Sequence, residues 1–335
     1  MRTRQLTIAT WLASGGLFRL QAALTGALLL GALIHAPARG ESGHASNKTR
    51  VLQCPEKYSL GALYLLQRAN LSNQVVSTRE AISRTQAQGR VTLPAKGFLL
   101  LAGSYSLGEN LQPLQKLKGN DLQILRLNKL TFKESELEYL SGLAGLQRLE
   151  VDSSDVSDKG LKAIAKLPNL VYLNLSRTLI TGKTLGDLAP LKKLTDLELG
   201  HNAICNGNLD GVASIQSLRA LRIQACQLHD RDLESISHLK NLESLTMHEN
   251  KMITDNGIKC LAKMPKLEYL DIGQTPITAG GIKALKACPL KTIRMEIGQF
   301  KKTEIAQLIT VFPKAKIIED NNGKRWNTAL FEPLH

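Results

Sequence analysis

Leucines recur along this chain at a nearly constant interval. Eight segments open with the pattern L-x-x-L-x-[LIVM], and only the last copy has isoleucine in place of the second leucine. Their first residues are Leu122, Leu146, Leu170, Leu194, Leu218, Leu242, Leu267 and Leu290. Successive starts lie 24, 24, 24, 24, 24, 25 and 23 residues apart. Each opening predicts a short strand, and the apolar residues that follow at helical spacing predict a return segment.

One segment, residues 146–169, shows why the interval matters. Leu149 and Val151 point to one side of the predicted strand, and Leu161 and Ile164 return at helical spacing to cover the same interior. A single coil of this kind cannot bury both apolar stripes. Stacked coils form a continuous core from contacts between neighbours, so the pattern predicts a solenoid of at least about three units.

The ninth position of each segment carries small or polar residues instead of leucine. From the second segment to the seventh they are Ser154, Thr178, Asn202, Cys226, Asn250 and Thr275. Most of these side chains can hydrogen-bond to peptide groups that a bend leaves unpaired. We therefore interpret this column as structural.

Residues 122–314 resemble the leucine-rich repeat family, in its bacterial variant with 24-residue repeats. The second half of that variant reads approximately I-T-D-x-G-L. Residues 156–161 (VSDKGL) and 253–258 (ITDNGI) match it, 277–282 (ITAGGI) nearly match it, and 204–209 (ICNGNL) depart from it.

The resemblance implies an α/β fold: a leucine-rich repeat solenoid, horseshoe- or arc-shaped, with a parallel concave β-sheet and helices on the convex side. It implies less about function, because the same scaffold carries unrelated partners. The fold alone therefore selects a class of binding surface and no particular ligand.

The chain divides into four predicted parts. Residues 1–38 form a signal peptide or an N-terminal anchor, and residues 39–97 a linker and a short helical N-terminal cap with two short helices in residues 55–90. Residues 98–318 form the solenoid of about nine units, the first one degenerate. Residues 319–335 are a C-terminal tail or cap.

The first residues of the chain predict export. Arg2, Arg4 and Arg19 precede an uncharged apolar run at residues 20–34, and Ala36-Pro37-Ala38 follows as a small-x-small site. This order is typical of a secretory signal peptide. The alternative is an uncleaved anchor, because residues 6–18 are also apolar, although neither run reaches the ~20 residues that span a bilayer. The expected localisation is periplasmic, cell-envelope or secreted.

Candidate catalytic and metal-binding groups are sparse. The five cysteines are an odd number spread over a long chain and predict no disulfide framework. His201 and His248 fall two coils apart, which places their strands about 9–10 Å from each other, too far for shared coordination of one metal. Phosphate loops and nucleophile motifs are missing from the sequence. We expect no enzyme and no cofactor; a catalytic protein whose repeats only present a substrate is the weakest alternative.

The net charge of +14 raises the question of an anionic partner. Many lysines, such as Lys162 and Lys166, fall on the predicted return helices and face outward from the convex side. Such a set is usually a solvated face. The alternative is binding to an anionic envelope polymer or to lipid head groups through that Lys-rich face. Nucleic acid is not favoured, because the chain carries an export signal.

Side chains that point outward from the concave strands form an ordered array in which strands are about 4.8 Å apart. The array combines both charges with tyrosine, which suits a protein or peptide ligand, since Tyr and Arg are frequent anchors and charges select the partner. The predicted ligand-binding residues are Arg148, Tyr172, Asn174, Asp196, Glu198, Arg222, His248, Tyr269 and Asp271.

The export signal gives the first testable prediction. We expect the mature chain to begin at Arg39 and to be found outside the cytoplasm, because the small-x-small site ends at Ala38. Amino-terminal sequencing of the mature protein measures this. A soluble cytoplasmic protein that retains Met1 would contradict it.

Overall fold

The computed structural model describes residues 48–72, 76–79, 81–204 and 208–320. The expected signal peptide or anchor at residues 1–38 and the tail beyond residue 320 lie outside the described residues, as does Cys205. All of the described residues belong to one compact unit, Ser46–His335.

A sheet of twelve strands dominates the described residues, in the order β14-β13-β12-β11-β10-β9-β8-β7-β6-β5-β2-β3. Strands β5 to β14 run parallel to one another, and each from β6 onward pairs with the strand of the preceding coil. Their bounds are β5 (Phe98–Gly103), β6 (Ile124–Arg126), β7 (Arg148–Glu150), β8 (Tyr172–Asn174), β9 (Asp196–Glu198), β10 (Ala220–Arg222), β11 (Ser244–Thr246), β12 (Tyr269–Asp271), β13 (Thr292–Glu296) and β14 (Lys316–Asp320).

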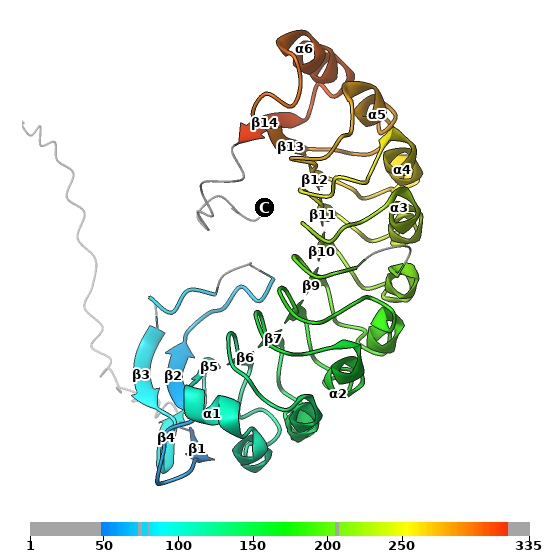
Figure 1. The fold of residues 1–335 in the computed structure, drawn as a ribbon. Helices are drawn as coiled ribbons and strands as arrows, with labels where there is room; N and C mark the ends of the chain where they lie inside the picture. Colours follow the sequence, from blue (N-terminus) through cyan, green and yellow to red (C-terminus); the bar gives the residue numbers. More distant parts are fainter. Residues whose placement is uncertain (1–47, 73–75, 80, 205–207, 321–335) are drawn as a thin grey trace, which may run out of the picture. The chain divides into compact units, whose positions relative to one another are not determined.

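Short helices return the chain between successive strands. The α-helices are α1 (Tyr105–Glu109), α2 (Leu161–Ile164), α3 (Asp230–Ser237), α4 (Asp255–Cys260), α5 (Ala279–Lys283) and α6 (Lys302–Val311). The 3-10 helices are η1 (Gln112–Lys116), η2 (Glu134–Gly142), η3 (Asp158–Gly160), η4 (Leu185–Leu188), η5 (Asp210–Ser214) and η6 (Leu261–Lys263). Figure 1 shows the strands along the inner, concave side of the arc and the helices along its outer, convex side. The predicted solenoid is confirmed.

The core is one continuous apolar cluster that runs through the stacked coils. The fourth position of each repeat opening forms a column with no solvent exposure: Leu125, Leu149, Leu173, Leu197, Leu221, Leu245, Leu270 and Ile293. The strand register pairs these residues directly from strand to strand, so each one packs on the same position of the next coil. The repeat period thus fixes the register of the sheet.

The ninth column clips neighbouring coils together, which confirms its structural role. Asn202 Nδ2 donates to the carbonyl oxygens of Leu175 at 2.7 Å and Leu199 at 2.8 Å. Its Oδ1 accepts from the Thr178 backbone N–H at 2.8 Å. Asn250 bridges two coils in the same way. Each buried amide therefore satisfies peptide groups that the bend leaves unpaired.

A second set of clips explains the T-D-x-G part of the repeat. Asp255 accepts hydrogen bonds from the Thr278 backbone N–H at 2.8 Å and from its hydroxyl at 2.5 Å, in the following coil. Asp230 binds Thr254 in the same way, at 2.6 Å for both contacts. Because each threonine is the N-cap of its coil's helix, the carboxylate of one coil anchors the start of the next helix.

Glycine in this motif makes room for the neighbouring carboxylate. A Cβ atom placed on Gly257 would lie 2.4 Å from Asp230 Oδ1, and one on Gly281 would lie 2.2 Å from Asp255 Oδ1. Real Cβ contacts are longer than this, so a larger residue would push the carboxylate out of its hydrogen bonds. The T-D-x-G spacing therefore reflects a contact between neighbouring coils in the repeats that carry the motif.

The N-terminal cap differs from the sequence-based expectation. Residues 55–90 were predicted to contain two short helices, but the structure has strands β2 (Gly61–Leu66) and β3 (Ala81–Gln86), preceded by β1 (Thr49–Gln53) and followed by β4 (Arg90–Pro94). Strand β2 pairs antiparallel with β5, and β1 with β4. The prediction of a helical cap was wrong: β2 pairs with β5 along its whole length and so hydrogen-bonds the outer row of peptide groups that β5 would otherwise leave unpaired.

No helix among residues 48–72, 76–79, 81–204 and 208–320 is long and apolar enough to span a membrane.

The core gives a prediction about stability. Leu173→Ala should lower the free energy of unfolding by about 2–5 kcal/mol, because it opens a cavity in the fully buried leucine column. In a solenoid the loss should loosen adjacent coils first. Denaturant titration measures the first effect and hydrogen exchange the second. An unchanged midpoint or uniform protection in the mutant would contradict the assignment.

The carboxylate clips give a matched pair of variants. Gly257→Ala should destabilise the chain by about 1–3 kcal/mol, because its Cβ meets the Asp230 carboxylate. Gly142→Ala is the control, since its nearest contact would be the Leu117 carbonyl oxygen at 3.7 Å. Thermal denaturation should separate the two variants. Equal melting temperatures would show that the clip does not require glycine.

Candidate functional site

The concave sheet brings all nine predicted binding residues together. They come from β7 to β12 and from the residue positions just after β11, and the register makes them cross-strand neighbours. Arg148 faces Tyr172, which in turn faces Asp196, while Asn174 faces Glu198, which faces Arg222. The predicted columns are therefore contiguous rows on one surface.

At the N-terminal side of this surface, arginine, glutamate and tyrosine form one network. Arg148 Nε binds Glu150 Oε1 at 2.6 Å, and Arg126 Nε binds Glu150 Oε2 at 3.0 Å. The Arg148 guanidinium carbon lies 3.4 Å from the centroid of the Tyr172 ring, a cation–π contact. The Tyr172 hydroxyl donates to Glu198 Oε2 at 2.7 Å.

Burial and neighbouring charge shift the proton equilibria of these groups. Burial raises the pKa of Tyr172 well above its ordinary value, and the adjacent Glu198 charge raises it further. Burial also raises the pKa of Asp196. Hydrogen bonds from Thr195 and Ser72 and the charge of Arg222 offset part of that increase. The tyrosine therefore remains a hydrogen-bond donor throughout the neutral pH range.

Most of the predicted binding residues are buried, which sequence reasoning did not anticipate. Tyr172 was expected to be exposed, yet its exposed fraction is 0%. Arg148 and Asp271 are also at 0%, whereas Asn174 and Tyr269 are partly exposed. The expectation for Tyr172 was wrong because the guanidinium of Arg148 lies on its ring and Glu198 holds its hydroxyl.

The connection between β2 and β3 covers part of the concave side of the sheet. We call its described residues, 67–72 and 76–79, the strap. Arg148 Nη1 donates to the carbonyl oxygen of Leu71 at 2.8 Å, and Arg126 Nη2 to that of Val76 at 2.7 Å. Ser72 reaches Asp196 on β9. The strap therefore contacts the concave side of β6, β7 and β9 (Figure 1).

Sequence reasoning missed the strap and its two arginine contacts. Val76 packs in a small apolar cluster with Leu66, Leu100 and Ile124, on the concave side of the first strands. The only available signal was Ile124 and Leu100, which are large apolar residues at concave positions where most other repeats are polar. Those two residues indicated that something covers the beginning of the sheet.

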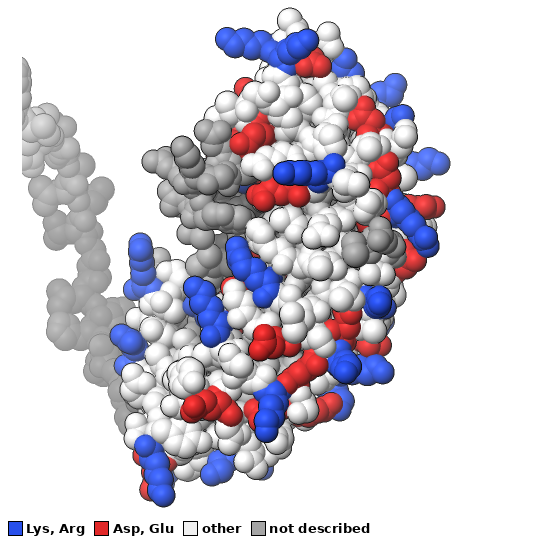
Figure 2. All heavy atoms as spheres, in the orientation of Figure 1, with Lys and Arg blue, Asp and Glu red and all other residues white. Residues whose placement is uncertain are grey.

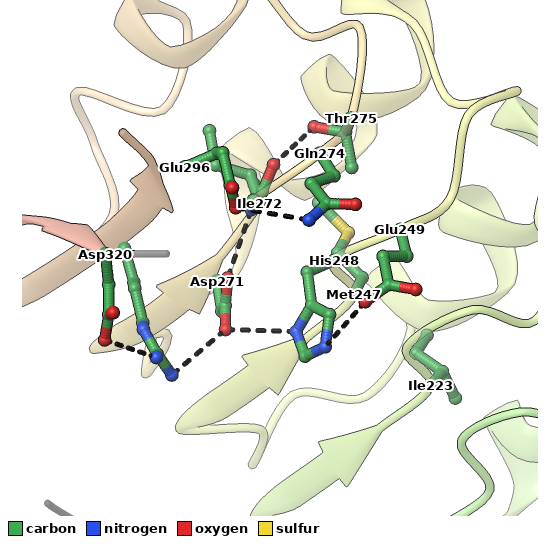
Figure 3. A network of polar contacts seen from close by, with 12 residues as sticks. Ile223, Met247, His248, Glu249, Asp271, Ile272, Gln274, Thr275, Glu296 and Asp320 are labelled. Atoms are coloured by element: carbon green, nitrogen blue, oxygen red, sulfur yellow. Dashed lines mark hydrogen bonds and ion pairs between the residues drawn. The ribbon is translucent and has the colours of Figure 1, made fainter. Parts of the chain in front are cut away.

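A second network lies at the C-terminal side of the sheet, shown in Figure 3. Asp271 Oδ2 lies 3.2 Å from His248 Nδ1 and 3.6 Å from Arg294 Nη1. Arg294 Nη2 binds Asp320 Oδ2 at 2.7 Å, which ties β13 to β14. Burial, followed by the charge of Asp271, raises the pKa of Tyr269 to about 12. Burial lowers the pKa of Arg294, but the nearby Asp271 and Tyr269 have a larger combined effect, so the pKa of Arg294 is raised.

Between the two networks, three buried polar atoms lack hydrogen-bond partners within the described part of the chain. They are Ser176 Oγ, Arg222 Nη1 and Gln224 Oε1, on the strands β8 and β10 or just after them. Arg222 Nη1 has only a long ion pair, 3.9 Å from Asp196 Oδ1. In the middle of the concave sheet, three buried polar atoms thus have no hydrogen-bond partner among the described residues.

The described residues contain no group of three or more His, Cys, Asp or Glu residues placed to hold a metal ion. Burial raises the pKa of Cys226 to about 12 and that of Cys54 to about 11, so both thiols stay protonated at neutral pH. The arrangement is suited to hydrogen bonding and ion pairing with a ligand.

Comparison with known proteins identifies the repeats. A family model described as leucine rich repeat matches residues 144–204, and a second model with the same description matches residues 238–262 and 263–286. No curated protein matches the chain.

Among solved structures, two internalins of Listeria monocytogenes are similar to the chain. One (inlF) has a TM-score of 0.48 and 23% identity, with 64% of this chain and 58% of that internalin covered. The other, internalin C2, has a TM-score of 0.47 and 27% identity, with 58% of this chain and 80% of that internalin covered. The chain thus spans less than two thirds of the first internalin's length.

Proposed function

We propose that this chain binds a protein or peptide partner on the concave sheet between β8 and β13. It is a leucine-rich repeat protein, and such repeats form protein-interaction modules. The proposed role is non-enzymatic and exported. The proposal rests on one observation above all, the polar atoms in the middle of that sheet that have no hydrogen-bond partner among the described residues.

Buried polar atoms without partners are rare because each costs the free energy of its lost hydration, about 1–3 kcal/mol. Arg222 lies on β10 and Gln224 follows it, whereas Ser176 follows β8, two strands away. A partner that supplies a carbonyl or carboxylate oxygen to the arginine and an N–H to the amide oxygen would remove that cost. A peptide backbone offers both groups.

The strap illustrates how this sheet holds a polypeptide. Arg148 and Arg126 bind carbonyl oxygens of an irregular segment, while the apolar side chain of Val76 packs beside them. Arg222 stands on β10, three strands beyond Arg148, with a side-chain nitrogen unoccupied by hydrogen bonds. The same mode of binding, continued along the sheet, suits an extended segment of a partner.

The remaining residues would set the specificity of such binding. Asn174 and Tyr269 are partly exposed and border the unpartnered atoms on either side. Asp196, Glu198, His248 and Asp271 are held in place by neighbours, so the three carboxylates have a defined arrangement. Fixed charges select a partner of complementary pattern and repel others.

Binding of an anionic polymer or lipid head groups to the convex lysines has less support. Lys166 pairs with Glu138 at 2.6 Å and Lys291 with Glu268 at 2.8 Å. Figure 2 shows basic and acidic side chains interspersed along the side of the helices. A surface of alternating sign attracts a polyanion weakly, and salt screens it.

A pair of variants tests the proposed function. Arg222→Ala with Gln224→Ala should weaken capture of a stoichiometric protein partner from a cell-envelope extract by at least about tenfold, because it removes the unpartnered donor and acceptor. The control pair, Lys162→Glu with Lys166→Glu, changes exposed convex residues and should leave capture unchanged.

Thermal denaturation must show that both variants keep their fold. If the convex pair abolishes binding and the concave pair does not, the ranking of the two functions reverses. Release of bulk polymer at high salt, without a discrete protein, would likewise favour the convex surface.

A further inference from the structure

The sheet has an open edge at its N-terminal end, away from the concave residues around Arg222. Strand β3 is the last strand of the sheet and pairs only with β2 among the described residues (Figure 1). The next strand, β4, follows after three residues but pairs with β1 in a separate sheet. A groove between β3 and β4 is the result, lined by apolar and polar residues of both strands.

The hydrogen bonds of Ala87, just after β3, show which peptide groups of the strand face β2 and which face outward. The Ala87 N–H donates to the Gly61 carbonyl at 2.8 Å, and its carbonyl accepts from the Leu60 N–H at 2.9 Å. Because peptide groups alternate in direction along a strand, Thr85 also faces β2, while Arg84 and Gln86 direct their N–H and C=O groups outward. Those outward groups are available to another strand.

The two edges of the groove differ in their suitability for strand addition. Strand β4 ends in Pro94, which has no N–H and blunts its edge. Strand β3 contains no proline, and its Ile82 side chain is 62% exposed beside the groove. Val91 and Leu93, buried on the opposite wall, provide apolar surface for alternate side chains of an added strand.

The charge around this edge selects the kind of strand that fits. Between residues 56 and 109 the sequence has six basic residues and three acidic ones, Glu56, Glu80 and Glu109. The basic residues are Lys57, Arg68, Arg79, Arg84, Arg90 and Lys96. Figure 2 shows basic side chains gathered over β2, β3 and their connection. The Arg84 side chain stacks over the ring of Tyr64 on β2, 5.6 Å from its centroid.

We propose that the outer edge of β3, with the groove between β3 and β4, binds an extended acidic segment of a partner protein by β-strand addition. The segment's peptide groups pair with those of Arg84 and Gln86. Its apolar side chains enter the groove beside Ile82, and its alternate carboxylates face Arg84 and Arg90. A second copy of this chain fits poorly, because pairing two β3 strands brings their Arg84 side chains together.

Two synthetic peptides of about eight residues serve as probes, one of alternating valine and glutamate and one of alternating valine and lysine. With the full-length mature chain, fluorescence anisotropy should show binding of the glutamate peptide that weakens as salt rises, and no binding of the lysine peptide. Absence of binding, or equal binding of both peptides, would overturn the proposal.

Variants and amide exchange locate the binding. Arg84→Glu with Arg90→Glu should weaken binding by about tenfold or more. The matched pair Lys240→Glu with Lys259→Glu, exposed on the helix side, should change it little. Bound peptide should slow amide exchange at Arg84 and Gln86 and leave that of Thr85, already paired with β2, nearly unchanged.

Three other outcomes would refute the assignment. Binding without new protection at Arg84 and Gln86 would place the peptide elsewhere. Protection of these amides in the free chain would mean that a segment of this chain already occupies the edge. A doubling of the mass at rising concentration, lost in the Arg84→Pro variant, would identify a second copy as the occupant.

Discussion

The structure depends on the inability of one coil to bury its own apolar residues. Each coil contributes a strand and a return segment whose apolar sides meet, and only the next coil closes that interior. The fully buried column from Leu125 to Ile293 shows the result, because each residue packs on the same position of its neighbours. Polar clips such as Asn202 and Asp255 cross between coils for the same reason, since the bends carry peptide groups that a single coil cannot pair.

Stacking of this kind leaves two ends, and they determine where the array deviates from its repeat. At the N-terminal end, β2 pairs with β5 in the opposite direction and covers its peptide groups. Gly61 allows the approach, since a Cβ there would lie 2.0 Å from the Ala102 carbonyl oxygen. As a result, β3 becomes the edge strand of the sheet, and the peptide groups of Arg84 and Gln86 are directed outward. The strap between β2 and β3 is then placed over the concave side of the first coils.

The concave surface is organised by charge pairs rather than by isolated charges. Glu150 lies between Arg126 and Arg148, and Asp271 lies between His248 and Arg294. Paired and hydrogen-bonded groups of this kind tolerate burial that single charges do not. The region around Arg222 and Gln224 differs, because Arg222 Nη1 has only a long ion pair with Asp196 and Gln224 Oε1 has no hydrogen-bond partner among the described residues.

The sequence by itself determined the solenoid, the register of its sheet and the polar clip at the ninth position, because a strict period places equivalent residues of successive coils in contact. It also identified the columns that hold the nine concave residues. Only the tertiary structure decided that residues 55–90 form strands, that the strap contacts Arg148 and Arg126, and that Tyr172 is buried. These features arise from contacts between non-repeating segments and the solenoid, and such contacts have no period in the sequence. Whether the polar atoms of Ser176, Arg222 and Gln224 have hydrogen-bond partners also depends on their neighbours in three dimensions, so no pattern in the sequence predicts it.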